Sequence, residues 1–304
     1  MPTGGGCGWW RSPVGIATSV ASSSTSTPKG TSRGSIPQRS ASGRGRPGRR
    51  RGAAGSLGAG ERRDPLREAL ATLADNEVGV TEVALDGRRA PLRAGETNLG
   101  DLVADALQWA VEELVFGTDD APADVAIMNG GGIRINQVVP AGAVTELDTF
   151  SMLPFASFVV RLPAVSRDEL KAVLENAFSQ AEDGAGRFPQ VAGMQIEWLP
   201  DGPARQLAPN GTVLQPGARV RRVVLDSGTV IVEDGVVRPG PPLVVATIDF
   251  LARGGDQYPF TGAFEAFGVS YQQALRDFIA GALEGRIDAA DYPEGASDRI
   301  RRLR

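Results

Sequence analysis

Apolar residues recur at helical spacing in several places beyond residue 61. Leu66, Leu70 and Leu73 follow Asp64 and Pro65, which predicts a helix with Asp64 as its N-cap and Pro65 at its first position. A second, longer helix is predicted from one apolar face, which comprises Leu99, Leu102, Val103, Ala106, Leu107, Ala110 and Leu114.

Two further helices are expected nearer the C-terminus. Ser166 and Glu169 have the spacing of a capping box, and the helix behind them is predicted to bury an apolar face. A last amphipathic helix is predicted over about 271–283.

Other segments show the patterns of strands. Alternation predicts a strand over 78–85 with a turn at Asp86-Gly87, and the apolar run 124–128 predicts a short buried strand. Further strands are expected at 144–147, 158–162, 194–198, 220–225, 230–232 and 243–248. Strands and helices alternate irregularly, and several strands have hairpin spacing. The pattern therefore predicts an α+β domain with mixed β-sheets and packed helices, rather than a doubly wound parallel sheet.

Residues 1–60 differ from the rest in both pattern and charge. They are rich in Gly, Ser, Thr, Pro and Arg, show no periodicity, and carry nine Lys or Arg without any Asp or Glu. The other 23 basic and 36 acidic residues give 61–304 a net charge of −13. A chain of the first composition cannot bury enough apolar surface to offset its ordering entropy. We therefore predict a disordered segment over 1–60 and one folded domain over 61–304.

The composition excludes several classes of chemistry. The 304 residues include no His and a single Cys, Cys7, so a catalytic triad, an imidazole metal site and an internal disulfide are all ruled out within this sequence. No apolar run approaches the length of a membrane span. The segment 14–21 is too short and too rich in Ser and Thr to indicate an export signal.

Residues 129–134, Asn-Gly-Gly-Gly-Ile-Arg, directly follow the predicted buried strand. Three glycines permit positive φ and close approach of a ligand, and their N–H groups could face an anion. Arg134 would add a planar donor suited to phosphate or carboxylate. The alternative is a flexible connection that ends in a surface arginine. No Lys-Ser/Thr follows, so the segment is not a Walker loop.

Three other segments could contribute to a site. Phe250 and Asp256 flank a predicted short helix that ends in glycine, and an aromatic and a carboxylate at this spacing could contact a base and a ribose. Phe155 follows a proline and is expected on a loop. Arg93 precedes the N-terminus of the long helix, where Thr97 or Asn98 would be the N-cap and anions are favoured. Taken singly, each is more typical of an ordinary cap, core or surface residue.

Together these segments resemble a known family. Arg93 with 96–106, the segment 129–134, Leu153-Pro-Phe155, the segment 186–193 (Gly-Arg-Phe-Pro-Gln-Val-Ala-Gly) and the segment 250–256 occur in the order found in the C-terminal, nucleotide-binding domain of 5′-nucleotidases. This family includes UDP-sugar hydrolases and ecto-5′-nucleotidase. The resemblance covers roughly 65–300.

The resemblance implies roles for eight residues. Phe155 and Phe250 would hold the base between them, and Asp256 would accept hydrogen bonds from the ribose hydroxyls. The remaining positions would contact the ribose, the nearest phosphate or the base edge: Arg93, Asn129, Gly131, Gly132 and Arg134. The expected ligand is a nucleotide or nucleoside of the AMP, ADP or UDP-sugar class.

The resemblance also implies where the chemistry lies. In this family an N-terminal metallophosphatase domain carries two divalent metals, and a sequence without histidine cannot rebuild that centre. We expect no catalytic residue, metal or cofactor in this chain, and no activity from it alone. The alternatives are a free-standing nucleotide-binding module and, through the basic run 44–51, a nucleic-acid-binding protein, which the charge of 61–304 disfavours. Family members are usually exported, so the localisation stays open.

Overall fold

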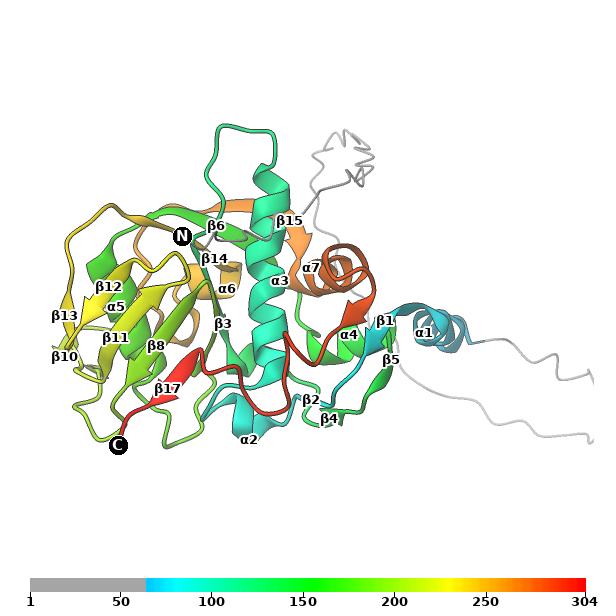
Figure 1. Ribbon diagram of the computed structural model, residues 1–304, viewed down its shortest axis with the longest axis horizontal. Helices are drawn as coiled ribbons and strands as arrows, with labels where there is room; N and C mark the ends of the chain where they lie inside the picture. The colour runs from blue at the N-terminus through cyan, green and yellow to red at the C-terminus, as the bar shows by residue number, and fades with distance from the viewer. Residues whose placement is uncertain (1–63) are drawn as a thin grey trace, which may run out of the picture. The chain divides into compact units, whose positions relative to one another are not determined.

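A five-stranded mixed sheet forms the centre of the fold in the computed structural model, which describes residues 64–304 (Figure 1). Its strands, in spatial order, are β15 (Glu265–Ser270), β6 (Phe158–Val165), β14 (Leu243–Ile248), β3 (Val125–Asn129) and β7 (Pro189–Ala192). β14 and β3 are parallel, and the other neighbours are antiparallel. The predicted α+β class with mixed sheets is therefore confirmed. The predicted disordered segment 1–60 and its basic run 44–51 lie outside the described residues.

Helix α3 (Asn98–Val115) crosses this sheet and covers one of its faces (Figure 1). Its predicted apolar face is buried from Leu99 to Ala110, and Leu114 is half-buried. Thr97 is the N-cap, because its hydroxyl oxygen accepts from the backbone N–H of Gly100 at 3.1 Å. Pattern and cap together therefore place this helix as predicted.

A second five-stranded sheet has the order β13 (Val236–Val237), β12 (Val230–Glu233), β11 (Val220–Leu225), β8 (Met194–Trp198) and β17 (Ile300–Arg302). Helix α5 (Arg167–Ala177) packs against it, and Phe178 stacks on Trp198 with ring centroids 4.8 Å apart. Ser166 caps α5 as predicted. The predicted capping box is wrong, because the Glu169 carboxylate accepts instead from the backbone N–H of Thr261 at 2.7 Å.

The remaining elements are short. They are α1 (Pro65–Asp75), β1 (Glu77–Thr81), β2 (Leu85–Asp86), α2 (Arg89–Leu92), η1 (Gly130–Gly132), β4 (Val138–Val139), β5 (Gly142–Thr145), α4 (Glu146–Met152), β9 (Gln206–Leu207), β10 (Val213–Gln215), α6 (Asp249–Ala252), η2 (Gly255–Gln257), α7 (Tyr271–Asp277), η3 (Phe278–Ala282) and β16 (Arg286–Ile287). Asp64 caps α1 as predicted.

Two predicted strands are wrong in their extent, and both errors arise from local polar contacts. The strand over 78–85 is interrupted, because the Thr81 hydroxyl donates to the carbonyl of Val83 at 2.8 Å and turns the chain between β1 and β2. The strand over 144–147 stops at Thr145, which forms a complete capping box with Asp148 and begins α4.

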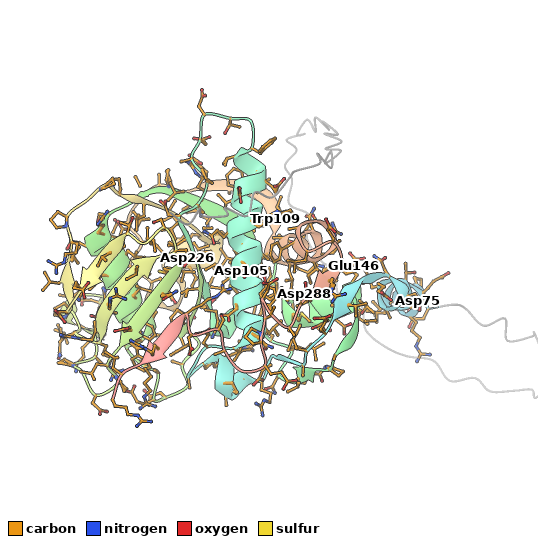
Figure 2. The ribbon with its side chains drawn as sticks, in the orientation of Figure 1. Asp75, Asp105, Trp109, Glu146, Asp226 and Asp288 are labelled. Carbon is orange, nitrogen blue, oxygen red and sulfur yellow. The ribbon has the colours of Figure 1, made fainter. Side chains whose placement is uncertain are left out.

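Helices α4 and α7 are joined through one carboxylate, that of Glu146, which is labelled in Figure 2. It accepts from Asn76 Nδ2 at 2.8 Å and from Arg276 Nη1 at 3.2 Å. The hydrogen bond from Asn76, followed by the contacts with Arg276, lowers the pKa of Glu146. These contacts fix the position of the helix that leads into residues 153–157.

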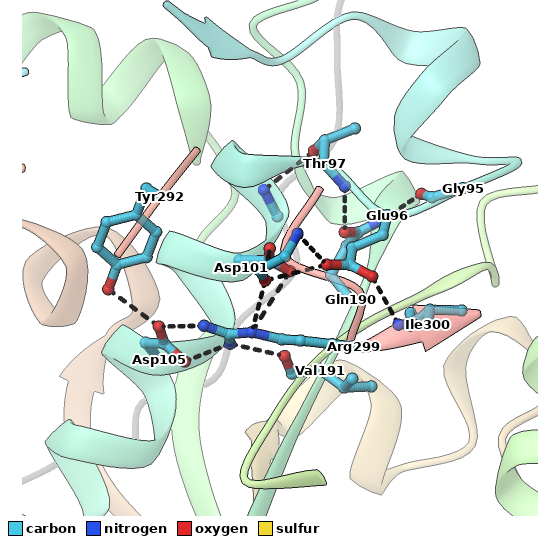
Figure 3. A network of polar contacts seen from close by, with 12 residues as sticks. Gly95, Glu96, Thr97, Asp101, Asp105, Gln190, Val191, Tyr292, Arg299 and Ile300 are labelled. Carbon is cyan, nitrogen blue, oxygen red and sulfur yellow. Dashed lines mark hydrogen bonds and ion pairs between the residues drawn. The ribbon is translucent and has the colours of Figure 1, made fainter. Parts of the chain in front are cut away.

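A polar network holds the C-terminal segment against α3 (Figure 3). Glu96 accepts from the backbone N–H groups of Ser297 and Ile300 at 2.8 and 2.6 Å. Asp105 on α3 forms a bidentate ion pair with Arg299, with nitrogen–oxygen distances of 2.5 and 2.9 Å. The segment 96–106 that resembles the nucleotidase family thus contributes mainly an N-cap and a structural clamp.

Asp101 is the buried carboxyl of this network. Its Oδ2 accepts from the Ser297 hydroxyl at 2.7 Å, and its Oδ1 has no hydrogen-bond partner among the described residues. Burial raises the pKa of Asp101 to about 8, and the nearby charge of Glu96 adds to this effect while Arg299 opposes it. Asp101 is therefore protonated at neutral pH in the folded protein.

Replacing Asp101 with Asn should flatten the dependence of stability on pH. The folded protein keeps the Asp101 proton up to about pH 8, whereas the ordinary pKa is 3.8. The folded state thus binds more protons between these values, and the wild-type free energy of unfolding falls as the pH rises across that window. Urea unfolding of the full chain between pH 5 and pH 9 measures this slope.

Asp226→Asn is the matched control, because Asp226, which is labelled in Figure 2, is exposed and makes none of the contacts of the network. It should leave the slope as in the wild type. An unchanged slope in Asp101→Asn would show that Asp101 does not hold the proton.

Candidate functional site

The directions of four central strands bring four loops to one edge of the main sheet. The parallel strands β14 and β3 end at this edge, and the antiparallel strands β6 and β7 begin there, as the pairs Ile248–Val159 and Asn129–Pro189 show. The segments 129–134, 153–157, 186–188 and 249–257 therefore meet. Seven of the eight predicted site residues lie in them.

Arg93, the eighth, is brought to the site by Gln190 on β7. The Gln190 side chain donates to the carbonyls of Leu92 and Gly95 at 3.2 and 2.8 Å, and accepts from the backbone N–H of Thr97 at 3.2 Å. These bonds hold the turn between α2 and α3. Arg93 is 9% exposed there, and its Nε has no hydrogen-bond partner among the described residues.

Three guanidinium groups form a cationic cluster: Arg89, Arg93 and Arg134. Burial lowers the pKa of Arg93, and the charges of Arg89 and then Arg134 lower it further, with Asp256 as the opposing carboxylate. Charges of one sign that gather around a buried donor favour an anionic ligand. Arg89 was not predicted from the sequence.

Asn129 and Asp256 meet directly. Asn129 Nδ2 donates to Asp256 Oδ2 at 2.7 Å, and Asn129 Oδ1 is buried without a hydrogen-bond partner among the described residues. Asp256 has a φ of 50°, in the left-handed region, and its carbonyl accepts from Asn176 Nδ2 at 3.1 Å. The Asp256 carboxylate is thus held in place beside Asn129 Oδ1, an acceptor without a partner among the described residues.

Arg187 supports the same turn. Its Nη2 donates to Gln257 Oε1 at 2.9 Å, and its Nη1 donates to the Ser179 hydroxyl at 3.2 Å. Burial lowers the pKa of Arg187 and the charge of Asp256 opposes that effect. Arg187 is therefore both a brace for the 255–257 turn and a further positive charge near Asp256.

The glycines at 130–132 pack closely against neighbouring backbone and side chains. None has a positive φ, and the N–H groups of Gly130 and Gly131 donate at 2.7 Å to the carbonyls of Phe188 and Gly186. A Cβ on Gly131 would lie 2.8 Å from Gly186 Cα, and one on Gly132 would lie 2.2 Å from Met128 Cε. The prediction that the backbone N–H groups face an anion is therefore wrong for Gly130 and Gly131. Close packing against the 186–188 loop and β3 explains why these residues are small.

Phe155 and Phe250 present exposed rings at the same edge. They are 50% and 46% exposed, and the Arg134 guanidinium carbon lies 5.5 Å from the centroid of the Phe155 ring. Phe250 borders an open hollow of about 550 Å³, a volume within the usual range for small-ligand pockets. The hollow is lined by Ala156, Ser157, Asp249, Phe250, Arg253, Gly254 and Gly255. Gly254 is in the left-handed conformation with a φ of 87°, as its predicted role at the end of the helix requires.

Within residues 64–304 no three His, Cys, Asp or Glu side chains come together in a group that could hold a metal ion. Across the same residues, no helix combines the length and apolar character that a membrane span needs.

Several residues around the site have no signal in the sequence pattern. The segment 186–193 was noted for its resemblance, yet nothing in its pattern assigned the bracing contacts of Arg187 or Gln190. Asn176 and Tyr271 lie in predicted helices but outside the apolar faces that the spacing indicated. Their roles depend on contacts between residues far apart in the chain, which periodicity does not reveal.

Known proteins resemble this chain in sequence and in fold. The family model "5′-nucleotidase, C-terminal domain" matches residues 77–263. The trifunctional nucleotide phosphoesterase protein YfkN of Bacillus subtilis (strain 168) is 30% identical over 245 residues, covering 77% of this chain and 15% of that protein. Protein UshA of Escherichia coli (strain K12) is 26% identical over 183 residues, covering 60% of this chain and 26% of that protein.

A solved structure with the same arrangement is the 5′-nucleotidase precursor from Thermus thermophilus. It superposes with a TM-score of 0.62 at 26% identity, over 79% of this chain and 42% of that one. This chain thus spans less than half the length of each of these three relatives. With more than half of its residues matched by the family model, the chain belongs to the 5′-nucleotidase C-terminal domain family.

Proposed function

We propose that this chain is the nucleotide-binding, substrate-specificity part of a 5′-nucleotidase-type phosphoesterase. One observation carries the proposal: a buried donor and a buried acceptor, Arg93 Nε and Asn129 Oδ1, both lack partners among the described residues at the edge where the site loops meet. An unpaired buried polar group costs about 1–3 kcal/mol, so both favour a ligand that supplies an anionic oxygen and a donor. A ribose phosphate has both.

The exposed rings of Phe155 and Phe250 favour the base, which is the remaining part of a nucleotide. Half-exposed phenylalanines are suited to stacking, because every base has a π-face. Phe250 borders the hollow, and Ala156 and Ser157, which follow Phe155, line it as well. A base stacked here would leave its ribose near Asp256 and its phosphate near the cationic cluster.

The hydrolytic chemistry is proposed to come from elsewhere. Residues 64–304 bring no three His, Cys, Asp or Glu side chains together in a group that could hold a metal ion, and the arginines can bind a phosphate but cannot generate a nucleophile. A metallophosphatase domain, as the family resemblance implies, would supply two divalent metals and activate water. In this division of labour, the present site selects and orients the nucleotide.

Removing either aromatic ring should weaken the binding of AMP. Stacking contributes about 1–3 kcal/mol per base, so Phe155→Ala and Phe250→Ala should each reduce the affinity roughly five-fold to a hundred-fold. Isothermal titration calorimetry on the full chain measures this. Phe150→Ala is the control, because Phe150 is a comparably exposed phenylalanine outside the four site loops. Unchanged affinity in both site variants would reject the stacking site.

Replacing Arg93 with Met should weaken AMP binding without lowering the free energy of unfolding. Loss of a charged hydrogen bond, worth about 1.5–3 kcal/mol, should weaken AMP roughly ten-fold or more and adenosine much less. The same change removes an unpaired buried donor and its repulsion with Arg89 and Arg134, so the free energy of unfolding should stay equal or rise. Calorimetry and urea unfolding measure the two effects. Arg67→Met on α1 is the control, because Arg67 is exposed.

The chain alone should release no phosphate from AMP, with or without added Mg²⁺ or Mn²⁺. A phosphate-release assay with the chain at micromolar concentration checks this. Metal-dependent turnover that Arg93→Met reduces would show that the chain builds its own catalytic centre.

A further inference from the structure

Tyr271 lies between two loops of the site. It is the first residue of α7 and is 1% exposed. Its hydroxyl oxygen accepts from the backbone N–H of Phe155 at 2.8 Å, and its O–H lies 3.4 Å from the carbonyl oxygen of Gly132, to which it donates. One buried hydroxyl therefore connects the loop of the stacking ring to the 130–132 turn.

Tyr271 also holds the Phe155 loop at a second point. Its backbone N–H donates to the carbonyl of Ser157 at 3.1 Å. Beyond that residue, the N–H of Phe158 donates to Asp249 Oδ1 at 3.0 Å, next to Phe250. The short segment between Pro154 and Phe158 is thus fixed at Phe155, Ser157 and Phe158.

The contact at Phe155 matters because the ring itself is held weakly. Half of the Phe155 surface is exposed, so its packing contacts are few, and the position of its backbone decides where the ring stands. The hydroxyl of Tyr271 bonds directly to that backbone, whereas the bonds at 157 and 158 act two and three residues away.

We propose that Tyr271 is a positioning residue for base stacking: its hydroxyl sets the Phe155 ring in register with the 130–132 turn, so that one ligand can contact both. The proposal rests on the proposed nucleotide-binding function. It assigns to Tyr271 an effect on the base-bearing part of the ligand, through Phe155, and none on the phosphate-binding part.

The hydroxyl must keep its proton to act in this way, since it accepts from one loop and donates to the other. Burial raises the pKa of Tyr271 to about 12. The hydrogen bond from the Phe155 N–H and the charge of Arg134 oppose this rise. Both bonds are therefore available throughout the neutral pH range.

The test is Tyr271→Phe in the full chain, which keeps the buried ring and removes only the hydroxyl. AMP should bind about five-fold more weakly, the effect of one neutral hydrogen bond. Ribose 5-phosphate, which lacks the base, should bind with unchanged affinity. In a double-mutant cycle, Tyr271→Phe should have no further effect on AMP once Phe155 has been replaced by Ala.

Tyr292→Phe is the matched control, because its buried hydroxyl donates to Asp105 Oδ2 at 2.9 Å in the C-terminal network. It should lower stability without changing AMP affinity. Hydrogen exchange in the wild type gives a second measurement that needs no variant: the Phe155 amide should be protected although its side chain is exposed.

Several results would overturn the proposal while leaving the proposed function intact. They are an unchanged AMP affinity in Tyr271→Phe, additive effects of the Tyr271 and Phe155 changes, an equal loss for ribose 5-phosphate, or an unprotected Phe155 amide. If the wild type binds no AMP, the proposed function fails and this inference fails with it.

Discussion

The hydrogen-bond register of β6, β14, β3 and β7 is the constraint on which the site depends. β14 and β3 run parallel, and their antiparallel neighbours begin where they end. A register shift of one residue would turn alternate side chains to the opposite face of the sheet and separate Asn129 from Asp256. The fully buried strands β3 and β14 prevent such a shift, because every side chain in them has a packed environment.

A second constraint is the need to satisfy buried polar groups near the site. Gln190 uses its whole carboxamide to hold the Arg93 turn, and the glycine turn uses the N–H groups of Gly130 and Gly131 for its own packing. Within residues 64–304, four buried side-chain atoms lack a hydrogen-bond partner, and two of them, Arg93 Nε and Asn129 Oδ1, lie at the site edge. Unsatisfied groups in an otherwise satisfied environment cost stability, and functional sites are where proteins commonly tolerate that cost.

Local pattern predicted much of the fold and part of the site. The strands at 194–198, 220–225 and 243–248, helix α3 with its cap, and the α+β class all followed from periodicity and cap chemistry. Helix α4 was missed, because the Thr145–Asp148 cap outweighs a short apolar run that is typical of a strand. β16 and β17 were missed because they are short strands that pair with β1 and β8, far away in the chain.

The polar clamp on α3 also bears on how the chain folds. Glu96 bonds to Ser297 and Ile300 across 201 and 204 residues, and β17 pairs in parallel with β8. Contacts of such sequence separation form late and slow the search for the native state. During synthesis, the carboxyl of Asp101 has no Ser297 hydroxyl to bond with until residues 297–300 have been made. A nascent chain that stalls before residue 297 would therefore lack the clamp on the N-terminal end of α3.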